Sequence, residues 1–294
     1  MGSCENQISL VRIDALSKDG TFEFDQFKAR NTDDNPTLTG VYVGDSHAGE
    51  LVFKDCELEG FSDNGLYASS PGLRSGKNGI VRVEGGKYRN NNISNIRLGS
   101  TGSTARNVDV VATDPPDAES VNVRGIRFRH RQDQLVENSR IHIGPDSGNG
   151  FGAVVFHPEN RGATVKNTAI EVHRDDYKAI FALPAIEPAE SGPVFENVSI
   201  SGEANGGFVG KIEGRTGTVF SGCTIDMSGV DRHGLRFSSA EDTLIEDCRI
   251  AVSGDPIVLR QSTATIVNTT IVSPDGETEH IERMDASDGD FTPR

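Results

Sequence analysis

Four arginines fall within eight residues near the middle of the chain: Arg124, Arg127, Arg129 and Arg131. Arg97 precedes them and His157 follows them. A guanidinium group donates hydrogen bonds from a rigid planar fork, which suits it to carboxylate and sulfate groups. Arg97, Arg127, Arg129, Arg131 and His157 therefore form a candidate site for an anionic ligand. The alternative is that Asp and Glu residues of neighbouring segments pair with these arginines, which would make them structural.

The chain as a whole is acidic, with 44 Asp and Glu against 29 Lys and Arg and a net charge of −15. Such a charge opposes non-specific binding to nucleic acid, so no nucleic-acid partner is expected. The bases are eight Lys and 21 Arg. Excess carboxylate with scarce lysine resembles the composition of halophile proteins, and the alternative is an ordinary acidic, soluble surface.

One short phrase recurs along the chain, as in residues 219–225, 244–250 and 265–271. In each copy an apolar residue lies two positions before Gly, Asn or Asp, and another apolar residue lies three positions after it. These central residues tolerate a left-handed backbone, so each copy predicts two short strands around a sharp bend. The central residues are Asp55, Gly85, Asn107, Asn138, Asn167, Asn197, Gly222, Asp247 and Asn268, with a degenerate copy at Phe24. Their spacing of 21 to 31 residues predicts a solenoid built from strands.

A third strand is expected between successive bends, because two apolar residues there flank one residue that points outward. The apolar pairs are Val41/Val43, Leu66/Ala68, Ile96/Leu98, Ile126/Phe128, Val154/Phe156, Ile180/Ala182, Leu235/Phe237 and Ile257/Leu259. We name the strands with these pairs sheet A, the strands before each bend sheet B, and the strands after it sheet C. On sheet A, Arg97 and Arg127 then occupy the outward position of consecutive coils, with Arg129 one step further along the strand.

At this point the sequence resembles the right-handed parallel β-helix proteins of the pectate-lyase-like superfamily, which carry asparagines at a bend of this kind. The resemblance rests on V-E-N-S-R-I at 136–141, V-K-N-T-A-I at 165–170, F-E-N-V-S-I at 195–200 and I-V-N-T-T-I at 266–271. It covers roughly residues 20 to 283 and implies an all-β fold, a single-stranded right-handed parallel β-helix with three strands per coil and about ten coils. We expect a lead-in of residues 1–20, a β-helix domain of residues 21–284 and a polar acidic tail of residues 285–294.

The superfamily includes lyases, hydrolases, viral tailspikes and adhesins, so the fold does not decide the activity. The resemblance to polygalacturonase-like members fails on spacing, because Asp33 and Asp175 lie about 24 Å apart along the rod, too far for a paired acid and base. A lyase would use an arginine to take a proton next to a uronate carboxylate, with Ca²⁺ as a candidate cofactor. No trio of aspartates at calcium spacing is visible, so the sequence favours binding over bond cleavage.

Four cysteines are present, at positions 4, 56, 223 and 248. Three of them occupy the small inward position after a bend, where parallel side chains point along each other rather than across, so we expect buried thiols and no disulfide. Neither a C-x-x-C pair nor a His/Cys cluster predicts a zinc site. No metal site is therefore expected.

An apolar stripe is expected further along the outer face of sheet A, at Val155, Phe181, Leu183, Val209 and Val258. It is either covered by a loop or buried against a partner, and the partner alternative would be a homotrimer through Val155, Phe181 and Val258. Residues 1–7 contain no apolar stretch, so no signal peptide is predicted, and no segment is long enough to span a membrane.

The sequence therefore predicts a surface or virion-associated β-helix that binds an acidic polysaccharide or glycan, extracellular or on a virion or cell surface. A polysaccharide lyase is the first alternative, and a purely structural spike or scaffold is the second.

Overall fold

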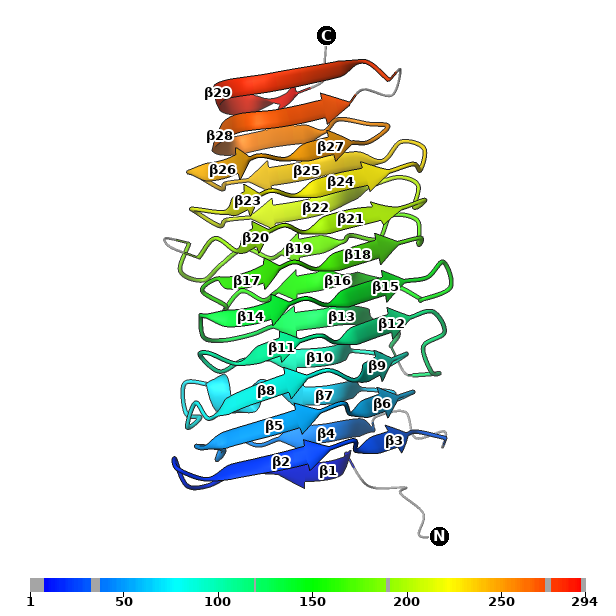
Figure 1. Ribbon diagram of the computed structural model, residues 1–294, viewed down its shortest axis with the longest axis vertical. Helices are drawn as coiled ribbons and strands as arrows, with labels where there is room; N and C mark the ends of the chain where they lie inside the picture. The colour runs from blue at the N-terminus through cyan, green and yellow to red at the C-terminus, as the bar shows by residue number, and fades with distance from the viewer. Residues whose placement is uncertain (1–7, 33–37, 119, 189–190, 273–275, 292–294) are drawn as a thin grey trace.

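The computed structural model describes residues 8–32, 38–118, 120–188, 191–272 and 276–291. They form a right-handed parallel β-helix in which each strand from β1 to β25 pairs with the strand three places further along the chain (Figure 1). The predicted all-β fold with three strands per coil is therefore confirmed. Cys4 and Asp33 lie outside the described residues.

Sheet A contains β1 (Ser9–Ile13), β4 (Thr39–Val43), β7 (Asn64–Ala68), β10 (Ser94–Leu98), β13 (Val123–Phe128), β16 (Gly150–Phe156), β19 (Ile180–Ala182), β22 (Phe208–Glu213) and β25 (His233–Ser238). Sheet B contains β2 (Thr21–Asp25), β5 (Glu50–Lys54), β8 (Ile80–Glu84), β11 (Thr104–Arg106), β14 (Gln134–Glu137), β17 (Ala163–Lys166), β20 (Val194–Glu196), β23 (Val219–Ser221) and β26 (Thr243–Glu246). Sheet C contains β3 (Lys28–Arg30), β6 (Glu57–Glu59), β9 (Lys87–Arg89), β12 (Asp109–Ala112), β15 (Arg140–Ile143), β18 (Ala169–Val172), β21 (Ser199–Gly202), β24 (Thr224–Met227) and β27 (Arg249–Ala251).

Two long strands complete the rod at its C-terminal end. β28 (Ile257–Val272) runs through all three sheets, and β29 (Thr278–Phe291) pairs with it in the antiparallel direction. Eight three-strand coils, β4 to β27, lie between this pair and the first strands β1 to β3. The count is slightly below the expected ten coils. A single 3₁₀ turn, η1 (Ser70–Gly72), is the one helical element of the described residues.

The predicted bends are confirmed by the backbone. All nine central residues, from Asp55 to Asn268, have a left-handed φ between 45° and 75°. The degenerate copy at Phe24 is wrong by two positions, because Phe24 pairs with Phe53 and the left-handed residue of that coil is Gln26, with φ of 55°. The pattern misplaced it because glutamine is not one of the residues that tolerate this conformation readily.

The inward side chains stack coil upon coil into one narrow core. Ile126 and Phe128 are fully buried, as are their counterparts in the neighbouring coils. Ile225, Ile250 and Ile271 lie in register on adjacent strands. Cys56, Cys223 and Cys248 are buried free thiols, which agrees with the prediction for these three residues.

The two ends of the rod are built differently. The lead-in contains strand β1, which pairs with β4, and the boundary at residue 284 falls inside β29. An unpaired last coil would expose a row of backbone donors and acceptors, and β29 covers it by pairing along β28. The first coil keeps apolar side chains at the surface, with Ile8 76% and Leu16 73% exposed.

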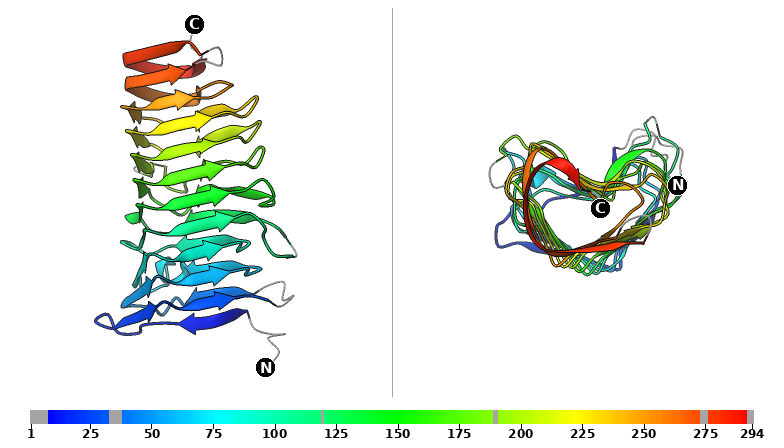
Figure 2. Two further views of the ribbon diagram at one scale, coloured as in Figure 1. Left: turned by 45° about the vertical axis from the view of Figure 1, so that its right-hand side comes forward. Right: turned by 90° about the horizontal axis from the view of Figure 1, so that it is seen from above.

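The rod is curved in cross-section and indented on one side (Figure 2). The last part of β29, which pairs with the sheet A segment of β28, lies at this indentation. Sheet A therefore forms the recessed face, whereas sheets B and C form the face seen in Figure 1.

Candidate binding site on sheet A

The outward residues of sheet A form one ladder along the whole rod. In register from β1 to β28 they are Arg12, Tyr42, Tyr67, Arg97, Arg127, Val155, Phe181, Lys211, Arg236 and Val258. Half of these ten described positions are cationic, three are aromatic and none is acidic. In a chain of net charge −15, this ladder is a local exception.

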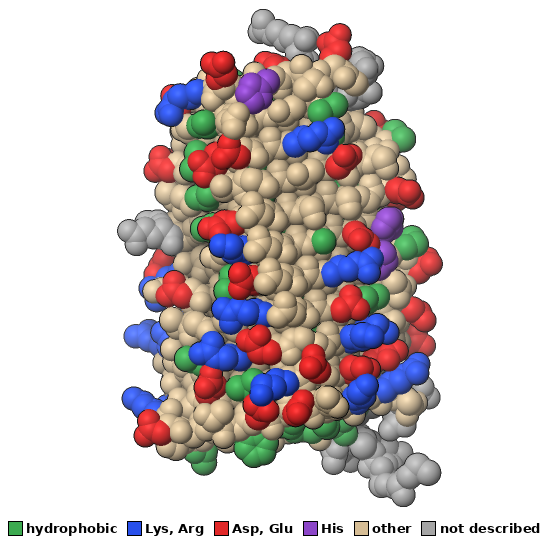
Figure 3. All heavy atoms as spheres, viewed as in Figure 1, with side chains coloured by type: hydrophobic (Ala, Val, Ile, Leu, Met, Phe, Trp, Pro, Cys, Tyr) green, Lys and Arg blue, Asp and Glu red, His purple; other side chains and the backbone are tan. Residues whose placement is uncertain are grey.

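The outer ladders of sheets B and C follow the opposite rule, because positive and negative residues alternate coil by coil. On sheet B the order is Asp25, Lys54, Glu84, Arg106, Glu137, Lys166 and Glu196. On sheet C it is Lys28, Glu57, Lys87, Asp109 and Arg140. Lys/Arg and Asp/Glu side chains are interspersed over this face in Figure 3. Charges that serve the scaffold are thus paired across strands, and the arginines of sheet A break this rule.

Arg97 lies beneath the surface, contrary to the expectation that it contacts a ligand directly. Arg97 is only 5% exposed, and its Nε donates a hydrogen bond of 2.7 Å to Ser69 Oγ. A second hydrogen bond of 2.7 Å runs from Nη2 to the Tyr67 hydroxyl, and the guanidinium lies 3.7 Å from the centre of a Tyr67 ring. Burial lowers the pKa of Arg97 to about 10. Arg97 therefore supports the site from below.

Arg127 is the centre of the cluster and lies directly opposite Arg97. Its Nε is buried and has no hydrogen-bond partner among the described residues. Burial, followed by the charges of Arg124, Arg97 and Arg129, lowers the pKa of Arg127 to about 8. A half-buried guanidinium whose charged neighbours are mostly positive is poorly compensated, and an anion would compensate it.

Arg129 carries the one ion pair that the cluster forms within the described part of the chain. Its Nη2 lies 3.0 Å from Glu159 Oε1, and the other oxygen of Glu159 accepts a hydrogen bond from the His157 ring. Burial and the charges of Arg129 and Arg127 lower the pKa of His157 to about 4. His157 is therefore neutral near neutral pH and contributes hydrogen bonding rather than charge. Within the described residues, pairing with a carboxylate is found for Arg129 and not for Arg97, Arg124, Arg127 or Arg131.

Arg131 lies at one edge of the recessed face, where its Nη2 donates a hydrogen bond of 3.0 Å to Leu73 O. A depression opens beside it. Its lining is Gly72, Arg74, His130, Arg131, Pro158, Glu159, Arg161, Ile186 and Glu187. Burial and the neighbouring charge of Arg129 lower the pKa of His130 to about 4.

A second depression lies towards the N-terminal end of the same face. Tyr42 and Tyr67 line it together with Thr39, Asp63, Asn92 and Ser120. The two tyrosine rings are 5.1 Å apart. Flat aromatic faces beside polar side chains suit the apolar faces and hydroxyl groups of a sugar. Neither tyrosine is among the site residues predicted from the sequence, although each occupies the outward position between two inward apolar residues.

Phe151 is a further residue that sequence reasoning missed. Strand β16 contains a bulge between the pairs Val123–Gly150 and Arg124–Gly152, and Phe151 is the extra residue. It is 36% exposed, its ring lies 5.9 Å from Phe181, and the Arg124 guanidinium lies 4.6 Å from its centre. A bulge redirects a side chain and has no signature in a strict two-residue alternation. The flanking glycines of Gly150-Phe151-Gly152 were the available signal.

The predicted apolar stripe is right in the outward positions of Val155, Phe181 and Val258 and wrong at Val209. Val155 and Val258 are only 1% and 3% exposed, and Val209 is a core residue. The outward residue next to Phe181 is Lys211, because the register pairs Phe181 with Lys211. Val155 and Val258 therefore offer no exposed surface for a trimer contact, and Phe181 is the one residue of the three that remains accessible.

A cluster of possible metal-ligating side chains that the sequence does not bring together lies on sheet C. His142, Glu171 and His173 each offer a ligand atom, and these atoms lie within 4.8 Å of one another. The residues are separated by up to 31 positions in the chain, so their proximity depends on the register of β15 and β18.

Comparison of the chain with protein-family models, curated protein sequences and solved structures finds no match. The class that the geometry defines is a parallel β-helix with a cationic, aromatic-flanked recessed face. No described helix is long and apolar enough to cross a membrane.

Proposed function

We propose that the protein binds an acidic polysaccharide on the recessed face of sheet A, with Arg127 and Arg129 as the contacting cations. The observation that carries the proposal is the arginine cluster itself. Among the described residues, Glu159 is the one carboxylate that forms an ion pair with the cluster, through Arg129. The five guanidinium groups of the cluster are those of Arg97, Arg124, Arg127, Arg129 and Arg131. Every other long charged ladder on the rod alternates in sign. Partly buried positive charges that lie next to one another without carboxylate partners are unfavourable, and a bound anion would stabilise them.

The shape of the ligand follows from the arrangement of the ladder. Paired strands of successive coils lie about 4.8 Å apart, so groups along the ladder repeat at a distance comparable to successive sugars of an extended chain. The depression beside Tyr42/Tyr67 extends over residues that precede the sheet A strands, and the depression beside Arg131 is lined by residues that follow them, so the two flank Arg97 and Arg127 across the width of sheet A. Phe151 and Phe181 supply a further aromatic surface next to the arginines. A linear polyanion with exposed sugar faces matches these features, and a surface or virion location fits such a ligand.

The test is binding of the full chain to polygalacturonate and alginate, with a neutral glucan as the comparison, by isothermal titration calorimetry at several salt concentrations. The acidic chains should bind, the neutral chain should not, and affinity should fall as salt rises, because the contacts are charge-assisted. The double variant Arg127→Ala/Arg129→Ala should lose binding about tenfold or more. Arg106→Ala is the matched control, since Arg106 is paired with Glu84 and Glu137 on sheet B.

Retention of acidic chains by the double variant, or equal retention of neutral chains, would remove the proposal and favour a purely structural role for the rod. The alternative of a polysaccharide lyase has one specific observation in its favour. The lowered pKa of Arg127, about 8, brings this arginine near the range in which a base can accept a proton. Rising ultraviolet absorbance from unsaturated uronate products, lost in Arg127→Ala, would identify the lyase.

A further inference from the structure

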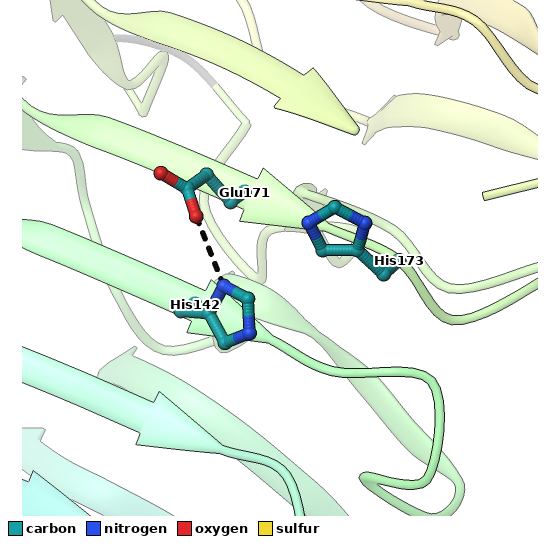
Figure 4. Close-up of side chains that lie close together, drawn as sticks. All are labelled: His142, Glu171 and His173. Carbon is teal, nitrogen blue, oxygen red and sulfur yellow. Dashed lines mark hydrogen bonds and ion pairs between the residues drawn. The ribbon is translucent and has the colours of Figure 1, made fainter. Parts of the chain in front are cut away.

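A second, independent site lies on sheet C, away from the recessed face. His142 belongs to β15 and Glu171 to β18, and the two residues are directly paired in register. His173 follows β18 by one residue and is held by its backbone N–H, which donates to Ile143 O at 2.8 Å. Because side chains alternate along a strand, Glu171 and His173 project from the same face. Figure 4 shows the three side chains gathered between the two strands.

We propose that His142, Glu171 and His173 bind a divalent transition-metal ion, with Zn²⁺ as the representative. Two imidazoles and one carboxylate form a typical three-residue set for such ions, with bonds of about 2.0–2.2 Å. Tetrahedral ligand atoms at that bond length lie about 3.3 Å apart. The three atoms here already lie within 4.8 Å of one another, so modest side-chain rotations close the site.

The hydrogen bonds of Glu171 show which atoms are available. Its Oε2 accepts from Arg140 Nη2 at 2.8 Å and contacts His142 Nδ1 at 3.0 Å. Its Oε1 has no hydrogen bond within the described residues and is free to meet a metal. The hydrogen bond from Arg140 is the largest influence that lowers the pKa of Glu171, so the ligand is a carboxylate near neutral pH. Arg140 thus orients the carboxylate as an outer partner, a common arrangement around metal ligands.

The presence of His173 distinguishes this cluster from an ordinary cross-strand charge pair. The pair of His142 and Glu171 alone would continue the alternation of sheet C. His173 adds a second imidazole whose centre lies 5.3 Å from that of His142. No described side chain forms a hydrogen bond with the ring of His173, so this ring has no structural partner that a metal would have to displace.

The surroundings set the strength and the geometry of binding. The side chains of His142 and Glu171 are 25% and 29% exposed, so water can complete the coordination. The charge of Arg140 opposes a second cation nearby, so we expect micromolar rather than tighter affinity. A bound ion would connect the coil of β15 to the coil of β18 and stabilise the rod locally.

The experiment is a titration of the chelator-treated full chain with ZnCl₂ by calorimetry near neutral pH, and with Co²⁺ followed by visible absorption. One site of micromolar Kd is expected. His142→Gln, Glu171→Gln and His173→Gln should each weaken binding about tenfold or more, since even outer partners of a ligand contribute that much. Zn²⁺ should raise the Tm of the wild type and leave that of the double variant His142→Gln/His173→Gln unchanged. Excess Ca²⁺ should not compete, because imidazole is a poor ligand for it.

His233→Gln is the matched control, since His233 also contacts a carboxylate, that of Asp255 at 3.2 Å, but no second histidine joins that pair among the described residues. It should bind Zn²⁺ as the wild type does. The proposal would be overturned if the double variant bound Zn²⁺ as tightly as the wild type does. It would also be overturned if His233→Gln lost as much Zn²⁺ affinity as the ligand variants, or if the wild type bound no Zn²⁺. Metal-free Tm values of all variants report whether folding is intact, and polysaccharide binding serves as a separate readout because the arginine cluster lies on another sheet.

Discussion

Arg97 on β10 and Arg127 on β13 lie directly opposite each other, like charges in register on adjacent strands. Such a pair is unfavourable on a sheet surface, and the same rod avoids it along its other long charged ladders. Arg97 is compensated by Tyr67 and Ser69. Among the residues that the structure describes, the Nε of Arg127 has no such hydrogen-bond partner. The predictions for the site start from this asymmetry.

Arg127→Met should raise the Tm slightly while it weakens binding of acidic polysaccharide about tenfold or more. Methionine keeps the buried stem and removes a poorly compensated charge, and such replacements are often neutral or stabilising. Thermal denaturation and calorimetric titration of the same preparations give both quantities. Arg106→Ala should do the reverse, with a lower Tm and unchanged affinity. A drop in Tm for Arg127→Met would mean that the guanidinium has a stabilising partner.

Affinity for the acidic chain should be independent of pH below about 8, as far as Arg127 is concerned, and should decrease above it. The folded-state pKa of Arg127 is lowered to about 8, so this group loses its charge as pH rises through that value. The unfolded chain keeps the proton to higher pH. The free energy of unfolding of the wild type should therefore rise with pH above about 8, relative to Arg127→Met. Parallel pH series of both proteins test this, and identical slopes would contradict the lowered pKa.

Ile250→Ala should lower the free energy of unfolding by roughly 2 to 5 kcal/mol, because it removes buried methyl groups and leaves a cavity. Ile250 is 1% exposed and lies between Ile225 and Ile271. Denaturant unfolding measures the change. Ile186→Ala, at a residue 68% exposed, should change stability by less than about 0.5 kcal/mol.

Asn197→Ala should destabilise the rod by roughly 1 to 2 kcal/mol, and Asn197→Gly by less. Asn197 has φ of 52°, which costs alanine but not glycine, and its side chain donates to Asn167 Oδ1 at 3.3 Å. Both variants lose the ladder hydrogen bond, so the difference between them isolates the backbone term. Equal values for alanine and glycine would show that the bend is not strained at this position.

The Tm of the protein should rise steeply between low and molar NaCl if its composition reflects halophily. A net charge of −15 on one rod produces repulsion that salt screens. The alternating ion pairs of sheets B and C oppose this trend, since salt weakens them as well. A Tm that stays constant across the range would leave the acidic surface as a means of solubility only.

The scaffold was open to prediction from the sequence because its determinants are local. A left-handed bend selects Asn, Asp or Gly within one residue, as at Asn167 and Gly222, and alternation assigns inward and outward sides within one strand. The same reasoning placed Arg97 and Arg127 on one face of consecutive coils, and the register confirms it.

What the tertiary structure decided depends on contacts between coils and on departures from the period. The burial of Arg97 depends on Tyr67 and Ser69 from the preceding coil, and the exposure of Phe151 depends on a single inserted residue in β16. The meeting of His142 with Glu171 depends on the register between two residues that are 29 positions apart in the chain. Periodicity specifies which way a side chain points, whereas the distance between two side chains from different coils depends on loop length and strand register, which only the folded chain establishes.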